Sequence, residues 1–187
     1  MKPEIVGAFA SVLLTLAVPA VSREQKSGSE YFDTGAEKMM KSGDATFAIK
    51  ASQIGVAEVK LGRLAIQKAS SSEVRALGQK MVDDHSKAND RLKAAAAKGG
   101  MTLPDTMTAD DQALYEKLSH LTGAIFDREY ARAMAKDHEE DIKEFQREAA
   151  KGANPDIRAF AAATLQILQE HLEMARSAER KVSSGGS

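Results

Sequence analysis

The stretch YARAMAKDHEEDIKEF, residues 130–145, decides the expected fold. Apolar residues and one histidine recur along it at spacings of four, four, four and three residues: Tyr130, Met134, His138, Ile142 and Phe145. These spacings place the residues on one face of an α-helix. The pattern therefore predicts a helix whose buried face carries a ligand-type side chain at its centre.

Three other segments carry the same pattern, with Glu58, His85 and His171 in the apolar stripe. Each of these side chains lies near the middle of its segment. Helices of similar length that pack together bring their midpoints to one level, and an offset of three residues moves a side chain by only about 4–5 Å. The expected helices span residues 44–69, 72–98, 124–151 and 155–181.

Helix-start signals support these segments. Asn154 followed by Pro155 combines a capping residue with a first-turn proline. Thr108, with Asp111 three residues later, resembles a capping box. If the third stretch is two helices, the short first one runs from about Ala109 to Leu121 and caps one end of the bundle. The expected stripe along the first part of the third stretch is Leu114, Leu118, Leu121 and Ile125.

The sequence predicts an all-α fold. Residues that favour helices dominate the long segments, and no β-alternation or hairpin signal competes with them. Short connections favour antiparallel neighbours, so the expected architecture is an antiparallel four-helix bundle in up-down-up-down order. The longer connection between the second and third long helices leaves a crossover open.

The composition excludes several classes of function. The chain has 187 residues, of which 43% are hydrophobic, enough for one domain with a core. Its formal net charge is −1, with acids and bases interspersed, which argues against nucleic acid or anionic lipid as a partner. Because it has no cysteine, thiol catalysis, cysteine-ligated zinc and disulfides are excluded. The sequence leaves open a homo-oligomer or an envelope protein partner.

The N-terminal residues 1–20 are typical of a secretory signal peptide. An apolar run from Ile5 to Ala17 is short for a membrane span, and Val18-Pro19-Ala20 resembles a cleavage site. Cleavage would leave a periplasmic or secreted protein with no membrane span, and the alternative is an uncleaved anchor. The other expected parts are a flexible linker at 21–43, the bundle at 44–182 and a disordered tail at 183–187.

The polar stripe residues form a candidate metal site. A glutamate and three histidines in an apolar core need partners, because an unpaired buried polar group costs about 1–3 kcal/mol. One divalent zinc, iron, manganese or copper ion would satisfy neutral imidazoles and a carboxylate. The alternative is a metal-free network in which Glu58 pairs with a protonated histidine. The candidate ligands are Glu58, His85, His138 and His171, with Asp141 and Tyr130 as additional candidates.

Acids flank the stripe histidines. Asp84, Asp137 and Glu170 each directly precede one of them. Adjacent side chains on a helix point about 100° apart, so we expect these acids on helix flanks, where a carboxylate can orient an imidazole. His120 lies off the stripe and is expected at the surface.

Several short segments match a family pattern in order and spacing: Phe47–Ala51, Glu58–Gly62, Met81–His85, Phe126–Tyr130 with His138, and Phe160–Ala161 with Leu168 and His171–Leu172. Together they resemble the ferritin-like family known as domain of unknown function 4142, over roughly residues 44–180. Members are typically bacterial and exported, and are often labelled outer-membrane proteins. The resemblance implies a ferritin-like four-helix bundle and no established activity.

The chain departs from the two-metal pattern of ferritin-like proteins, which combines four carboxylates with paired Glu-x-x-His motifs. The residues three positions before the stripe histidines are instead Val82, Ala135 and Leu168. Ferroxidase and iron-storage chemistry are therefore disfavoured, and a mononuclear site or a metal-free descendant fits better.

Three functions follow from these patterns. The first is an exported metal-binding protein without enzymatic activity. The second is a metal-free structural or stress-related interaction protein of the cell envelope. The third is a small metal-dependent oxidase or peroxide-handling enzyme, which requires an open coordination position and a substrate channel. The enzyme is the least favoured, because the sequence shows neither requirement.

Overall fold

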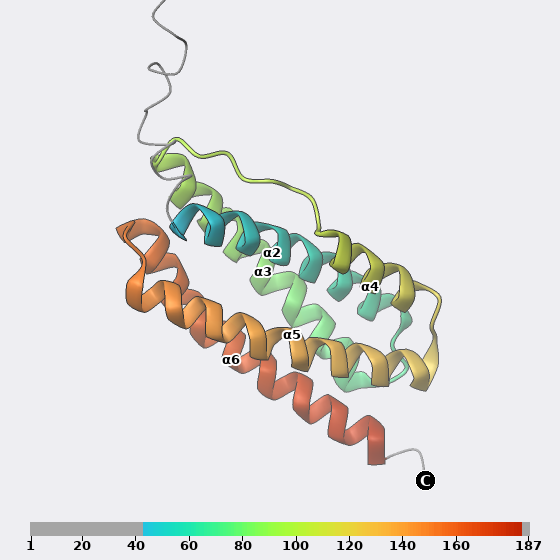
Figure 1. Ribbon diagram of the computed structural model, residues 1–187. Helices are drawn as coiled ribbons and strands as arrows, with labels where there is room; N and C mark the ends of the chain where they lie inside the picture. The colour runs from blue at the N-terminus through green and yellow to red at the C-terminus, as the bar shows by residue number, and fades with distance from the viewer. Residues whose placement is uncertain (1–42, 185–187) are drawn as a thin grey trace, which may run out of the picture. The chain divides into compact units, whose positions relative to one another are not determined.

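The structure is a computed structural model that describes residues 43–184. Regular structure in that range is entirely helical, as the sequence predicts, and none of these helices has the length and apolar character needed to cross a membrane. The expected signal peptide, the linker up to residue 42 and the tail from residue 185 lie outside the described range. The helices are α2 (Gly43–Lys68), α3 (Ser72–Lys98), α4 (Ala109–Ser119), α5 (Gly123–Lys151) and α6 (Pro155–Ser184) (Figure 1).

Side-chain caps form at the expected helix starts. The Ser71 hydroxyl accepts hydrogen bonds from the backbone N–H groups of Glu73 at 3.2 Å and Val74 at 3.4 Å. Thr108 and Asp111 form a complete capping box at the start of α4. These caps satisfy donors that the first turn of a helix leaves unpaired. The short helix expected before the third long helix is therefore confirmed.

The chain breaks between α4 and α5 at Gly123, whose φ of 59° lies in the left-handed region. This break resets the helical register, so the apolar stripe of α4 does not continue into α5. Ile125 is 55% exposed, and Phe126 is fully buried instead. The expectation for Ile125 is wrong because it assumed one continuous helical face.

Contacts at the bundle ends define the directions of the helices. α2 packs along α3, and α5 along α6, each pair joined by a short turn. Asp127 near the start of α5 accepts hydrogen bonds from Ser70 and Ser71 at the start of α3. Lys98 at the end of α3 pairs with Asp156 at the start of α6. Thus α3 and α5 run in the same direction, the connection between them is a crossover (Figure 1), and the up-down-up-down order is wrong.

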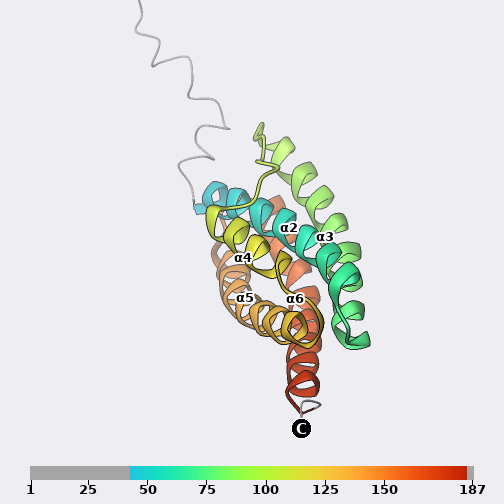
Figure 2. The same cartoon turned by 90° about the vertical axis from the view of Figure 1, so that its right-hand side faces the viewer.

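The crossover leads along the side of the bundle. Ser52 in α2 donates a hydrogen bond to the carbonyl of Pro104 in this connection at 2.7 Å. α4 then packs against α2 and α5, and Figure 2 shows it alongside α2. The expectation that the short helix caps one end is therefore wrong, because the crossover delivers the chain to the side of the bundle.

Contacts at the two bundle ends repeat reciprocally 83 residues apart (44 and 127, 70 and 153). Asp44 accepts hydrogen bonds from the backbone N–H groups at 153 and 154, and Asp127 accepts them from those at 70 and 71. The two hairpins are therefore related by an internal pseudo-twofold axis. Two further contacts repeat at the same interval of 83 residues. The Arg75 side chain donates to the carbonyl of Ala69, as the Arg158 side chain does to the carbonyl of Gly152. The ion pair Lys98–Asp156 likewise corresponds to the ion pair Lys181–Glu73.

The core consists of two apolar clusters, separated along every long helix by a polar side chain. In α3, Met81 belongs to one cluster and Ala88 to the other, and His85 lies between them. Glu58 occupies the corresponding place in α2 between Ala51 and Leu61. A polar layer therefore crosses the middle of the bundle.

α2 and α3 approach each other closely at two glycines. A Cβ atom on Gly62 would lie 2.6 Å from the carbonyl oxygen of Gly78, and one on Gly78 would lie 2.8 Å from the carbonyl oxygen of Gly62. Both obstacles are backbone atoms within packed helices, so neither can move without separating the helices. Glycine at these positions therefore determines how closely α2 and α3 pack.

We expect Gly62→Ala to lower the free energy of unfolding by about 1–3 kcal/mol, the usual cost of overpacking a core. The clash outweighs the gain that alanine normally gives in a helix interior. Urea unfolding followed by circular dichroism measures the change. Gly43→Ala is the control, because a Cβ there meets nothing within 4 Å. Equal stability of the two variants would contradict the close approach.

Candidate metal centre

Each long helix contributes one side chain to the polar layer. Glu58 comes from α2, His85 from α3, His138 from α5 and His171 from α6. The exposed fractions are 3% for Glu58, 4% for His85 and 0% for the other two. The sequence predicts these four residues at one level of the bundle, and the structure brings them together there.

The three histidines form the closest group. One ligand atom from each lies within 4.8 Å of the other two. Nδ1 of His171 is 3.3 Å from Nε2 of His85 and 3.3 Å from Nε2 of His138. Three ring nitrogens therefore face a common point, and this arrangement is compatible with a bound metal ion.

Outer partners determine which ring nitrogens carry protons. Nδ1 of His138 lies 3.0 Å from the carbonyl oxygen of Met134, and Nε2 of His171 lies 3.0 Å from Oδ2 of Asp84. A carbonyl or an ionised carboxylate only accepts hydrogen bonds, so these outer nitrogens are the donors. In the neutral rings, the inner nitrogens then hold lone pairs, which is the form that coordinates a metal.

Glu58 adjoins the histidine group. Its Oε2 lies 2.6 Å from Nε2 of His85, and its Oε1 lies 3.4 Å from Nδ1 of His138. Both oxygens are fully buried, and neither has a hydrogen-bond partner of acceptable geometry. Burial alone would raise the pKa of Glu58, but His85 and His138 outweigh it and hold that pKa low. The carboxylate therefore stays charged beside the ring nitrogens, where either a protonated histidine or a metal ion can pair with it.

Burial disfavours a charge on two of the histidines. It lowers the pKa of His138, and it lowers the pKa of His171 to about 4, with a further contribution from nearby His85. Both rings are therefore neutral at pH 7. Their inner nitrogens face each other at 3.3 Å as two lone pairs, and neither can donate to the other.

Asp84 supports the group from the edge of the bundle. Its side chain is 15% exposed, and its Oδ2 also lies 2.7 Å from Nζ of Lys80. The expectation that an acid on a helix flank orients an imidazole is thus confirmed for Asp84. Glu170 instead lies 49% exposed near Lys80, and His120 is at the surface as expected.

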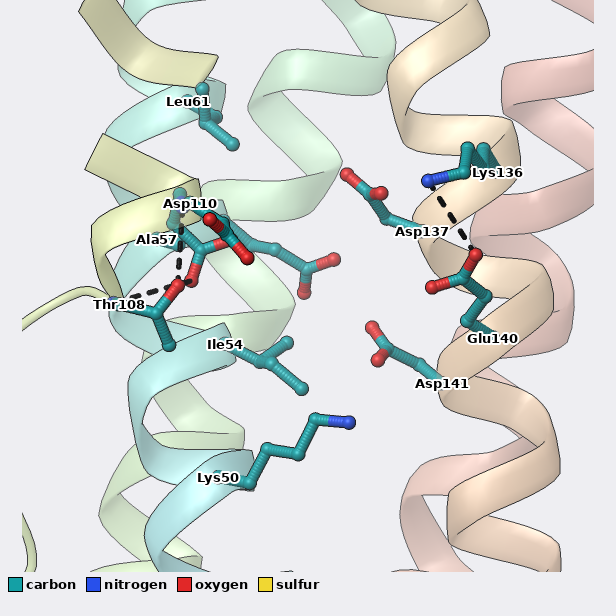
Figure 3. Close-up of a pocket in the computed structure, with 12 residues that line it drawn as sticks. Lys50, Ile54, Ala57, Leu61, Thr108, Asp110, Lys136, Asp137, Glu140 and Asp141 are labelled. Atoms are coloured by element: carbon teal, nitrogen blue, oxygen red, sulfur yellow. Dashed lines mark hydrogen bonds and ion pairs between the residues drawn. The ribbon is translucent and has the colours of Figure 1, made fainter. Parts of the chain in front are cut away.

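A cavity of about 330 Å³ lies beside the metal centre, between α2, the start of α4 and α5 (Figure 3). Glu58 and Asp141 both line it. Asp141 is only 6% exposed, so it points inward as predicted. Burial, with the nearby Glu58 carboxylate, raises the pKa of Asp141 to about 9 and that of Asp137 to about 6. The cavity is thus a second polar region that periodicity alone does not reveal.

Tyr130, the other additional candidate, lies in the apolar core. It is fully buried, and its ring stacks on Phe126 with centroids 5.5 Å apart. Burial raises the pKa of its hydroxyl, so the group stays protonated. The hydroxyl has no hydrogen-bond partner among the described residues. The structure therefore places Tyr130 in the packing around the site rather than within the histidine group.

These features define an all-helical protein with a buried cluster of three histidines. A family model described as "Domain of unknown function (DUF4142)" matches residues 31–178. Because this match covers most of the chain, the protein belongs to the DUF4142 family, as the resemblance implied. No curated protein and no solved structure matches the chain significantly.

We expect nitrogen-detected NMR of the protein to show His138 with its proton on Nδ1 and His171 with its proton on Nε2. In Asp84→Ala, the His171 preference should weaken because its acceptor is removed, while His138 keeps the Met134 carbonyl. Long-range ring correlations distinguish the two tautomers. The opposite tautomers in the parent would mean that the inner nitrogens are not lone-pair donors.

Proposed function

We propose that this protein binds one divalent transition metal ion at the bundle centre through His85, His138 and His171, with Glu58 as the neighbouring carboxylate. Neutral imidazoles and a carboxylate suit zinc, iron, manganese or copper. A bound ion would link the four long helices and neutralise Glu58, so metal binding would contribute to the stability of the fold. The proposed role is binding rather than catalysis.

The observation that carries the proposal is the pair of inner nitrogens on His138 and His171, 3.3 Å apart. A cation satisfies both lone pairs and the Glu58 carboxylate together. The metal-free alternative pairs Glu58 with a protonated histidine, and the distance of 2.6 Å to His85 suits such a pair. That pairing still leaves His138 and His171 facing each other without a proton between them.

We further propose that the architecture is ferritin-like. Two packed helical hairpins, joined by one long crossover connection, are the arrangement that distinguishes ferritin-like bundles from simple up-and-down bundles. The crossover beside α2 and membership of the DUF4142 family support this assignment. A ferritin-like bundle presents inward side chains from all four long helices at its centre, which is where the three histidines lie.

Export to the periplasm is also proposed, because residues 1–20 have a short apolar run followed by small residues. N-terminal sequencing of the protein recovered from fractionated cells tests this. A first residue near position 21 in the periplasmic fraction would support export. An intact Met1 in the cytoplasmic fraction would contradict it.

We expect the protein, purified without a histidine tag and stripped with a chelator, to take up about one metal ion per chain and to melt at a higher temperature when loaded. His138→Ala and His171→Ala should lose both effects. His120→Ala is the control, because that histidine is exposed. Elemental analysis and thermal melts provide the measurements. A folded parent that takes up no zinc, iron, manganese or copper would exclude the proposed function.

We expect Asp84→Asn to weaken metal affinity by about 10–100-fold, the typical effect of removing a group that orients a histidine ligand. Asp83→Asn is the matched control, because Asp83 is exposed and its Oδ1 accepts only from Gln79. Competition with a chromophoric chelator measures both affinities. If both variants bind like the parent, Asp84 does not orient a ligand.

A further inference from the structure

The cavity beside the metal centre shares a wall with it. Glu58 lines the cavity, and its Oε2 also lies 2.6 Å from Nε2 of His85. The three histidines are at most 4% exposed, so an ion in solvent cannot meet their nitrogens directly. An ion that binds there must pass through the protein, and this cavity reaches a residue of the centre.

Negative charge dominates the cavity wall. Both lysines of the wall already have carboxylate partners, since Lys50 lies 2.6 Å from Glu144 and Lys136 lies 3.5 Å from Glu140. A cleft lined by one sign of charge concentrates counterions from solution. The acidic residues of the wall are Glu58, Asp110, Asp111, Asp137, Glu140 and Asp141.

Asp141 has the features of a cation ligand in this cavity. Only 6% of its surface is exposed, and it makes no hydrogen bond or ion pair with any residue that the structure describes. Figure 3 shows its carboxyl group directed into the cavity, on the side facing Ile54. A buried carboxyl without a partner retains its proton, and a cation that enters the cavity would displace this proton into the solvent. It is also the pseudo-twofold counterpart of Glu58 (58 and 141).

We propose that the cavity is the route by which a divalent transition metal ion reaches the histidine cluster, and that Asp141 holds the ion in transit. This inference rests on the proposed metal binding. Asp141 and water would provide oxygen ligands first, and Glu58, which touches both regions, would pass the ion inward. Imidazole nitrogens suit such ions better than carboxylate oxygens, so the transfer is favourable.

The test is the rate at which the metal-free, full-length protein takes up Co²⁺, followed in a stopped-flow instrument by the visible absorption of the bound ion. We expect Asp141→Asn to slow uptake by about tenfold or more, because an amide cannot release a proton and so cannot give the entering ion an anionic oxygen ligand. A residue that only assists passage changes the free-energy barrier to entry and release, and it leaves the free energies of the bound and the free ion unchanged. Release should therefore slow by the same factor, and the dissociation constant should stay within about threefold.

Asp90→Asn is the control, because Asp90 is an exposed acid on α3 outside the cavity and should leave both rates unchanged. Asparagine keeps the shape of aspartate, and circular dichroism verifies the fold of each variant. Unchanged uptake in Asp141→Asn would overturn the route while leaving metal binding intact. Faster release with unchanged uptake would also overturn it, because Asp141 would then be a permanent ligand. A parent that takes up no Co²⁺ would instead overturn the proposed function.

Discussion

The close approach of two imidazole lone pairs, from His138 and His171, is the constraint on which the centre of the bundle depends. Nε2 of His138 and Nδ1 of His171 lie 3.3 Å apart, and each outer nitrogen is committed to an acceptor. The metal ion proposed to bind between them would convert this repulsive contact into coordination. Without a cation, neither nitrogen has a proton to donate to the other, because burial lowers the pKa of both rings.

The convergence of the histidines requires the two hairpins to be held in register. Asp44 and Asp127 do this from opposite ends, because each carboxylate of one hairpin accepts hydrogen bonds from the turn of the other. A carboxylate that accepts two backbone N–H groups defines position along the helix axis far more strictly than apolar packing does. Close packing at Gly62 and Gly78 then fixes the separation of α2 and α3. The site is thus positioned by polar contacts about two helical turns or more away from it.

The helices and the four central residues were predictable, because a helical repeat of 3.6 residues determines which side chains share a face. Asp84 could be anticipated as a flanking acid for the same reason. The direction of the third long helix could not be predicted. The connection after Lys98 is compatible with either an antiparallel neighbour or a crossover until contacts such as that of Ser52 with Pro104 are known. Ile125 was misplaced because one glycine at positive φ changes the face of the next helix. The cavity depends on the spacing between α2 and α5, which no local pattern encodes.

The internal pseudo-twofold symmetry holds at the bundle ends but not for the histidines at the centre, so the bundle has one histidine cluster rather than two. Contacts at the ends repeat 83 residues apart, but the histidines do not: the counterpart of His138 is Gly55, that of His85 is Leu168, and that of His171 is Ala88. Only the carboxylates persist, as Glu58 and Asp141. The first lies against the rings of His85 and His138, and the second lines a cavity that has no aromatic ring in its wall. A symmetric scaffold therefore holds an asymmetric set of polar side chains, with ring nitrogens on one side and carboxyl groups on the other. On the proposed route, this asymmetry would give an ion a direction of travel, from weak oxygen ligands toward stronger nitrogen ligands.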